Sequence, residues 1–418
     1  MQETEKGHCP MVDLTHEYNP FVSPQLEDPY PIWERAREAQ PVFYSDVLDA
    51  WVVTRYQDVV SVLRNTDMFG QNAGRKLFSE VCPEADRILA ELPPLNEVVP
   101  SASDAPQHTK LRRYMHPAFV PRRVASLQSQ LRAISNDLID AFEPRGHGDF
   151  YEDYAHTYPF LMICELVGLP EEHRAQVAEW ADVQARLRYG NLSPDEQIVT
   201  AEELRDFYEF NRELVQRRRA EPGDDLLSWI IEDSDASTDP LSEAQLAYQI
   251  QVMLSAGHET SSSFLVMMMS GVLRDPPRWA SLVEDPASSR AVVEELFRLY
   301  GSVQSVWRRA KADAEIDGVA IPPGALVSVV VGSANADAEA FASPRTFQPD
   351  RENVTRHVAF GRGVHTCVGA PLARSSTAIS IESLATRLPK LRLAADPGLV
   401  FEPSALMRKA MQLHVEWT

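Results

Sequence analysis

A glycine-rich segment around one cysteine, residues 360–369, holds the residue types best suited to chemistry in this chain. It has the sequence Phe-Gly-Arg-Gly-Val-His-Thr-Cys-Val-Gly, and an apolar helical run begins directly after it at Ala370. Glycines let a backbone pass close to a flat ligand because they carry no Cβ. A cysteine just before a helix has its thiolate favoured by the positive end of the helix dipole. Since a thiolate is a strong donor to iron, Cys367 is a candidate iron ligand; the alternative for a lone cysteine is packing in a core.

A second segment, Ala-Gly-His-Glu-Thr at residues 256–260, places polar groups in a largely apolar helical run. A glycine inside a helix costs about 1 kcal/mol relative to alanine, and close approach of a flat cofactor or of O2 at Gly257 would offset that cost. Glu259 and Thr260 add an acid and a hydroxyl, and a buried carboxylate needs a task or a partner. The alternative is a surface turn of the helix.

Two further patterns pair charged residues at helical spacing. Glu295 and Arg298 are three apart and share a helix face, which on its own describes a surface ion pair of little energetic value. His108 and Arg112 are four apart and also share a face, and a solvated basic turn would explain them equally.

The bulk properties exclude several classes of protein. The chain has 418 residues and a net charge of −21, which argues against nonspecific nucleic-acid binding and against adsorption to anionic lipid. Its four cysteines are far apart, so neither a disulfide framework nor a zinc site is indicated. No signal peptide and no run of about 18 apolar residues is present. We therefore expect a soluble, cytoplasmic protein.

The pattern of elements predicts one large, mainly α domain with a small β part, spanning 29–418 after a polar lead-in at 1–28. Ser242 to Gln245 forms a capping box for a helix that could run to Arg274, crossing the interior and opened locally near Gly257 with room for water. Residues 41–54 are typical of a hairpin and residues 122–220 of successive helices. Short strands are expected at 314–316, 319–321, 326–331 and 411–417, and an irregular segment at 66–104.

The cysteine segment, read as Phe-Gly-x-Gly-x-His-x-Cys-x-Gly, resembles the heme-binding loop of the cytochrome P-450 superfamily. His-x-x-x-Arg, Ala-Gly-x-Glu-Thr and Glu-x-x-Arg also match that family's motifs and occur in its order, so the resemblance covers about residues 28–417. It implies the cytochrome P-450 fold of the bacterial soluble type, with heme b (iron protoporphyrin IX) as cofactor. Locally, residues 43–45, 51–56 and 301–303 resemble the heme domains of self-sufficient members, which carry a fused reductase.

The resemblance also implies roles for individual residues. Cys367 would be the axial iron ligand, while Glu259 and Thr260 would deliver protons and hold water. Arg308 would meet a heme propionate, with Arg309 as a rival that the sequence does not exclude. The other implied residues fall into three groups: heme contacts at His108, Arg112, Gly257, Phe360, Gly361, His365 and Gly369; a structural ion-pair network of Glu295, Arg298 and Arg351; and a substrate pocket with Leu254, Val303, Val306, Leu406 and Met407.

The implied activity is that of a monooxygenase, which inserts one oxygen atom from O2 into a C–H bond of a small, mainly apolar substrate by hydroxylation or O-dealkylation. Because the given chain has no fused reductase after Thr418, separate redox partners are expected, a ferredoxin or flavodoxin with its reductase. We expect a monomer without nucleic-acid or membrane partners. An H2O2-dependent peroxygenase and a non-enzymatic heme sensor are the alternatives. The arginines at 186–188 could meet an acidic group of the substrate or lie on a solvated helix.

Overall fold

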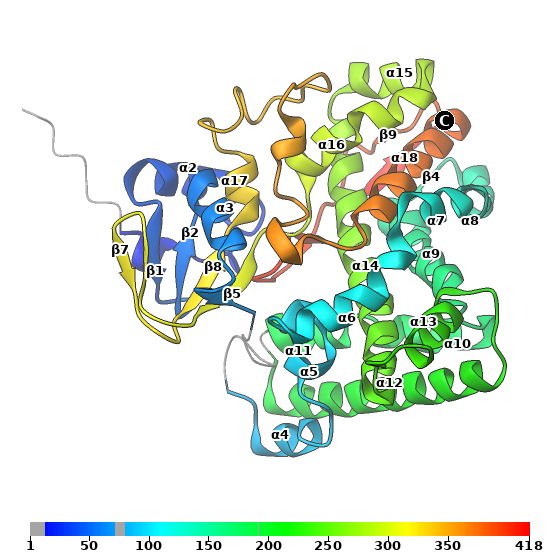
Figure 1. Ribbon diagram of the computed structural model, residues 1–418. Helices are drawn as coiled ribbons and strands as arrows, with labels where there is room; N and C mark the ends of the chain where they lie inside the picture. Colours follow the sequence, from blue (N-terminus) through cyan, green and yellow to red (C-terminus); the bar gives the residue numbers. More distant parts are fainter. Residues whose placement is uncertain (1–12, 72–79, 191) are drawn as a thin grey trace, which may run out of the picture.

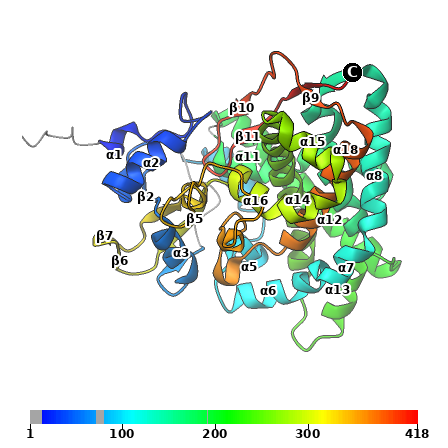
Figure 2. The same ribbon diagram turned by 90° about the horizontal axis from the view of Figure 1, so that it is seen from above.

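The structure, a computed structural model, describes residues 13–71, 80–190 and 192–418. Two views at right angles show a sheet-containing part beside a larger helical part, with the helix α14 (Glu243–Leu273) running through the helical part (Figure 1, Figure 2). The mainly α architecture with a small β part is therefore confirmed. No helix in the described part of the chain combines the length and the apolar character needed to cross a membrane.

Helices account for most of the described chain. Before α14 they are α1 (Leu14–Glu17), α2 (Tyr30–Ala39), α3 (Tyr56–Arg64), α4 (Pro83–Leu89), α5 (Leu95–Val98), α6 (Gln107–Met115), α7 (Pro121–Ser126), α8 (Gln128–Phe142), α9 (Thr157–Val167), α10 (Glu171–Trp180), α11 (Val183–Tyr189), α12 (Pro194–Ala220) and α13 (Leu226–Asp235). After it come α15 (Pro276–Glu284), α16 (Ser289–Tyr300), α17 (Val331–Asn335) and α18 (Ala370–Arg387).

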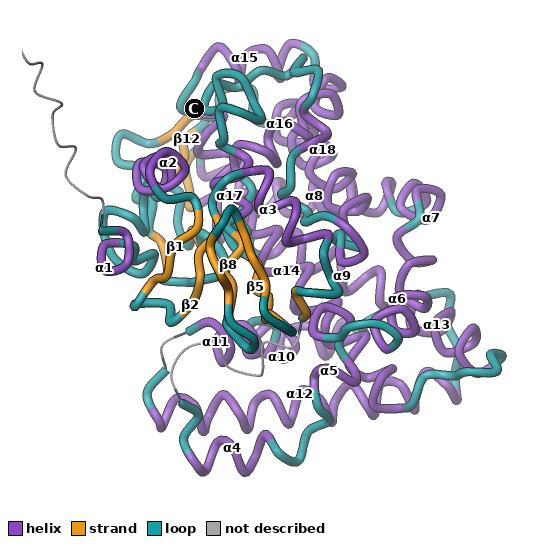
Figure 3. The backbone as a smooth tube through the Cα atoms, turned by 60° about the vertical axis from the view of Figure 1, so that its left-hand side comes forward, coloured by secondary structure: helices purple, strands orange, loops and turns teal. Residues whose placement is uncertain are grey.

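The largest sheet has five strands in the order β1-β2-β8-β5-β3, and Figure 3 shows four of them side by side. They are β1 (Val42–Ser45), β2 (Ala50–Val53), β3 (Phe69–Gly70), β5 (Val306–Ala310) and β8 (Leu326–Val329). All pairs are antiparallel except β2 with β8, where Val53 lies opposite Val329. Smaller sheets join β4 (His147–Asp149), β12 (His414–Glu416) and β9 (Arg392–Leu393); β6 (Ala314–Ile316) and β7 (Val319–Ile321); and β10 (Phe401–Glu402) and β11 (Lys409–Ala410).

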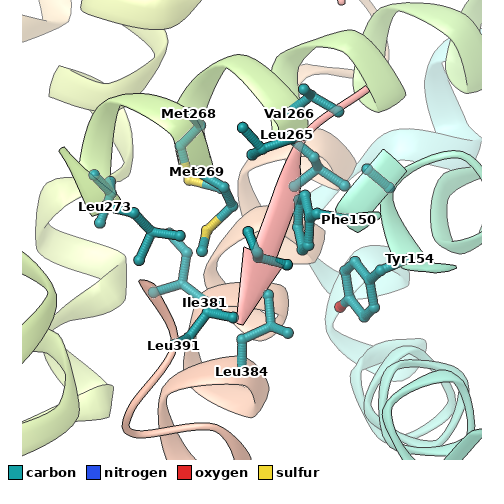
Figure 4. Close-up of a cluster of buried hydrophobic side chains, with 14 of the residues drawn as sticks. Phe150, Tyr154, Leu265, Val266, Met268, Met269, Leu273, Ile381, Leu384 and Leu391 are labelled. Atoms are coloured by element: carbon teal, nitrogen blue, oxygen red, sulfur yellow. The ribbon is translucent and has the colours of Figure 1, made fainter. Parts of the chain in front are cut away.

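Helix α14 begins at the expected capping box. The Ser242 hydroxyl accepts from the Gln245 N–H at 3.2 Å, and the Gln245 amide oxygen accepts from the Ser242 N–H at 3.0 Å. The helix is buried over much of its circumference, and Met267, Met268 and Met269 belong to a large apolar cluster with α18 and the segment around Tyr154 (Figure 4). The long helix, its cap and the packing role of its methionines are thus confirmed.

Three local expectations need correction. Residues 66–104 were expected to be irregular, but their described part contains α4 and α5, because Pro83 stands in the first turn of α4 and Pro94 is the N-cap of α5, positions that tolerate proline. Helix α14 is continuous past Gly257 and shows no opening. The terminal strand is shorter than predicted, residues 414–416 only. In the lead-in, Leu14 and Tyr18 are buried in a cluster with Trp33 and Phe43.

Candidate functional site

The cysteine loop, residues 360–369, folds back on itself between the sheet side and α18. The Cys367 N–H donates to the Phe360 carbonyl at 2.8 Å, which closes the loop. Gly361 and Gly363 have φ angles of 70° and 78°, in the left-handed region that glycine adopts without strain. Arg112 on α6 donates to the Thr366 carbonyl and ties the loop to that helix. These contacts fix the direction in which the cysteine side chain points.

Cys367 presents its exposed surface to an interior cavity rather than to the outer surface of the protein. Burial raises the pKa of its thiol, while the backbone N–H groups of Gly369 and Ala370 and the cation of Arg112 act in the opposite direction. Burial is the largest of these influences, so the helix terminus alone does not provide the thiolate. A bound metal cation would, since a coordinating thiol is deprotonated. The site chemistry therefore fits an iron ligand.

The cavity has a volume of about 430 Å³ and a mainly apolar lining. The loop forms one wall, α14 contributes Gly257 and Thr260, and the opposite side carries Val303 and Val306. Thirteen of the residues singled out by sequence line it: His108, Arg112, Gly257, Thr260, Val303, Val306, Arg308, Phe360, Gly361, His365, Cys367, Gly369 and Leu406. A group with a flat face and apolar edges would fit between the loop and α14.

Leu254, Met407 and Glu259 lie outside this lining. Leu254 is fully buried in the cluster between α9, α12 and α14, and its neighbours Val252 and Met253 line the cavity instead. One residue along a helix rotates a side chain by about 100°, which the apolar composition of α14 does not reveal. Met407 is also buried and forms a β-bridge with Val303, so it supports the wall from behind.

Cationic groups gather at one end of the cavity. The rings of His108 and His365 lie 4.0 Å apart between centroids, and Arg112 and Arg308 line the same cavity. Burial, together with His108 and Arg308, lowers the pKa of His365 to about 3. The buried Nε2 of His108 has no hydrogen-bond partner among the described residues. This donor set fits the two carboxylates of heme b.

The strand β5 distinguishes between its two arginines. Successive side chains on a strand point to opposite faces. Arg308 is buried and lines the cavity, whereas Arg309 donates to the Gly324 carbonyl at 2.6 Å on the exposed side. The geometry therefore favours Arg308 over Arg309 as the propionate contact.

A buried ion-pair network lies behind the loop. Glu295 is fully buried and accepts two hydrogen bonds from Arg298, each 2.7 Å long, while the Arg351 Nε lies 3.2 Å from both of its oxygens. Arg298 also donates to the carbonyls of Asn335 and Pro344, and Arg351 to that of Ala342. The network thus ties α16 to the long segment that leads into the cysteine loop, which fits the structural role inferred from sequence.

Sequence reasoning missed a second network at the same place. Glu294 accepts from His357 at 2.8 Å and from Arg374, whose guanidinium also stacks over the Phe360 ring at 4.5 Å. Burial raises the pKa of Glu294, but hydrogen bonds from His357 and Arg374 outweigh it and hold the pKa at about 2. The three partners are distant in sequence, and only the neighbouring Glu295 was conspicuous.

On α14 the acid and the hydroxyl point in different directions. The Thr260 hydroxyl donates to the Ala256 carbonyl at 2.7 Å and lies at the cavity. Glu259 pairs with Lys409 of β11 at 2.9 Å, and Lys409 also pairs with Glu402 at 2.9 Å. Burial raises the pKa of Glu259, and Lys409 opposes that rise. The buried carboxylate thus has a partner, Lys409, that the sequence did not indicate.

Gly257 lines the cavity, but its missing Cβ faces the protein. An added Cβ would come within 2.7 Å of Ile163 on α9. Close packing of α9 on α14 therefore explains this glycine, rather than the approach of a cofactor expected from sequence.

Comparison with known proteins agrees with this site. The family model "Cytochrome P450" matches residues 289–388. The chain is 35% identical over 373 residues to cytochrome P450 107B1 of Saccharopolyspora erythraea, covering 88% of this chain and 89% of that one, and 30% identical to the cytochrome P450 monooxygenase PikC of Streptomyces venezuelae, covering 100% and 97%. The solved structure of an intact type IV self-sufficient cytochrome P450 monooxygenase matches with a TM-score of 0.92 and 28% identity, over 98% of this chain and 54% of that one. The chain accordingly belongs to the cytochrome P450 family and is a heme b-dependent monooxygenase.

Proposed function

We propose that this monooxygenase inserts one oxygen atom from O2 into a C–H bond of a small, mainly apolar molecule bound between α14 and the cysteine loop. Hydroxylation and, for a methyl ether, O-dealkylation are the reactions that this would give. The observation that supports the proposal most directly is one apolar cavity with Cys367 on one wall and the Thr260 hydroxyl on another. Pockets with apolar walls and few polar groups are typical of small-molecule sites.

Heme b, when bound, supplies the activation of O2, and the chain's own residues hold and surround it. Cys367 would donate to the iron, and Arg112, Arg308, His108 and His365 would hold the two propionates. Thr260 would position a water at the α14 wall, and Glu259 would pass protons toward it from its contact with Lys409. Apolar side chains such as Val303 and Val306 would exclude bulk water and orient the substrate.

Electrons would come from a separate ferredoxin or flavodoxin with its reductase. Three arginines lie together on the outer side of the cysteine loop. Arg362 donates to the Arg356 carbonyl at 2.8 Å, and Arg64 lies beside Gly363. Such carriers are usually acidic, and a basic patch on a chain of net charge −21 would steer them to the face nearest the iron ligand.

The test compares three ways of driving the heme-loaded protein. Product formation with NAD(P)H, a ferredoxin and its reductase under O2 is measured against H2O2 alone and against O2 without a donor. Turnover that requires the redox chain supports the proposal. Equal or faster product formation with H2O2 alone would favour the peroxygenase, and no turnover with either, together with a ligand-dependent heme spectrum, would favour the sensor.

A further inference from the structure

One charged side chain in the cavity wall has no part in the roles described so far. Arg188 on α11 lines the cavity and is only 9% exposed. We propose that Arg188 binds an anionic group, a carboxylate or a phosphate monoester, at one end of an otherwise apolar substrate. This inference rests on the proposed monooxygenase function and names the substrate class for that site.

The register of α11 separates Arg188 from its neighbour Arg186. Residues two apart on a helix point about 200° away from each other. Arg186 donates to Glu203 and lies 3.7 Å from Asp182, so carboxylates of the protein balance its charge. Arg188 lies on the side of the helix that faces the cavity. Of the two readings left open by the sequence, the solvated helix describes Arg186 and the substrate contact describes Arg188.

The charges around the cavity point to the same conclusion. Its described lining contains three arginines and two histidines and no Asp or Glu. The two carboxylates of heme b balance two positive charges at the end where Arg112, Arg308, His108 and His365 gather. Arg188 leaves the cavity with a further positive charge in an apolar wall. A second anion would compensate the cost of keeping a guanidinium there, and a planar guanidinium can bind a carboxylate or phosphate with two parallel hydrogen bonds.

The position of α11 also indicates how such a substrate would lie. Val183 and Leu187 of α11 pack in one cluster with Ala247 and Tyr248 of α14. Gly257 follows nine residues after Tyr248, which is roughly 14 Å along the helix axis at 1.5 Å per residue. The anionic end would therefore be held away from Cys367, with the apolar part along Val252 and Met253. Oxidation would fall on the part of the molecule remote from the anion.

The experiment measures binding of matched ligands to the heme-loaded protein. Decanoate, decyl phosphate and 1-decanol are titrated, and dissociation constants are read from the spin-state change of the heme spectrum and from isothermal titration. We expect at least one of the anions to bind about 10- to 100-fold more tightly than the alcohol, as charge-assisted hydrogen bonds would give. The two anionic arms show which head group the site prefers.

Two variants on the same helix assign the effect. Arg188→Met should abolish the preference for the anion and change the affinity for 1-decanol by no more than about twofold, because only the head-group contact is lost. Arg186→Met removes the same charge from the same helix and should keep the preference. Arg188→Lys should retain part of it.

The outcomes separate this inference from the function on which it rests. Anions that bind no better than the alcohol, or not at all, would overturn it, and so would a preference that survives Arg188→Met. If those variants still show the thiolate-type heme spectrum and still bind the alcohol, the monooxygenase assignment stands while the substrate class fails. A wild-type protein without that spectrum would overturn both.

Discussion

The sulfur of Cys367 is the one protein atom that the iron chemistry depends on. Cys367→His should therefore lose the strongly red-shifted Soret band that the reduced, CO-bound heme shows with a thiolate ligand. Cys82→Ala and Cys164→Ala should keep the band, since Cys164 is buried in a core cluster and Cys82 lies near Pro194, as should Cys9→Ala, whose position lies outside the described residues. The absorption spectrum of each reduced, CO-treated variant checks this. A normal band in Cys367→Ala would contradict the assignment of the ligand.

Thr260 and Glu259 should fail differently because they face different surroundings. Thr260→Ala removes the hydroxyl at the cavity, so water is held less well there, and more NAD(P)H should be consumed with release of H2O2 and without matching product. Glu259→Gln should lower turnover and increase the solvent isotope effect, since a proton carrier is lost. Product formed per NAD(P)H oxidised, measured with H2O2 release, distinguishes them. Unchanged coupling in both variants would mean that the pair is structural.

Lys409 should contribute stability that depends on pH. Burial raises the pKa of Glu259, so its protonated form is favoured at low pH and needs no partner there. At higher pH the ionised carboxylate relies on Lys409, and breaking a buried pair costs roughly 3–5 kcal/mol. Lys409→Met should therefore destabilise the protein more at pH 8 than at pH 5. Urea unfolding at the two pH values measures the difference, and an equal loss at both would show that Glu259 is not the group affected.

At the scale of elements, the buried network of Glu295, Arg298 and Arg351 joins α16 to the segment before the cysteine loop. Arg351→Ala should lower the free energy of unfolding by roughly 3–5 kcal/mol, because it leaves Glu295 with an incompletely compensated charge. It should also weaken heme retention. A matched control is Arg219→Ala, whose exposed pair with Asp235 should be worth about 0–1 kcal/mol. Denaturant titration and heme content after gel filtration test both, and equal effects of the two changes would contradict the prediction.

The outer face of the cysteine loop should govern electron delivery. Arg362→Glu places a negative charge where an acidic carrier would dock, so reduction should slow and its dependence on salt should weaken. Affinity for the substrate should change little, because Arg362 does not line the cavity. Stopped-flow reduction by the cognate carrier at several ionic strengths measures this. Indifference to the change would place the docking site elsewhere.

Across the whole molecule, the sequence was most informative where signals are local. The capping box at Ser242, the hairpin at 42–53 and the order of the motifs were readable because each depends on neighbouring residues. The partner of Glu259 was not, since Lys409 comes from a distant strand, and neither was the network of Glu294, His357 and Arg374. Leu254 was placed on the wrong side of α14 for lining the cavity, because that helix is apolar nearly all round and its orientation is set by α9 and α12.

The parallel pairing of β2 with β8 also has a consequence for biosynthesis. Val53 leaves the ribosome early, whereas its neighbour Val329 in the sheet is made only after most of the chain. At typical synthesis rates this delay is on the order of tens of seconds, during which one edge of the β1–β2 hairpin has no strand beside it. Contacts between such distant segments also slow folding. A nascent chain of this protein therefore exposes an adhesive strand edge for most of its translation, and shortened versions ending before residue 326 should be recovered mainly as aggregates.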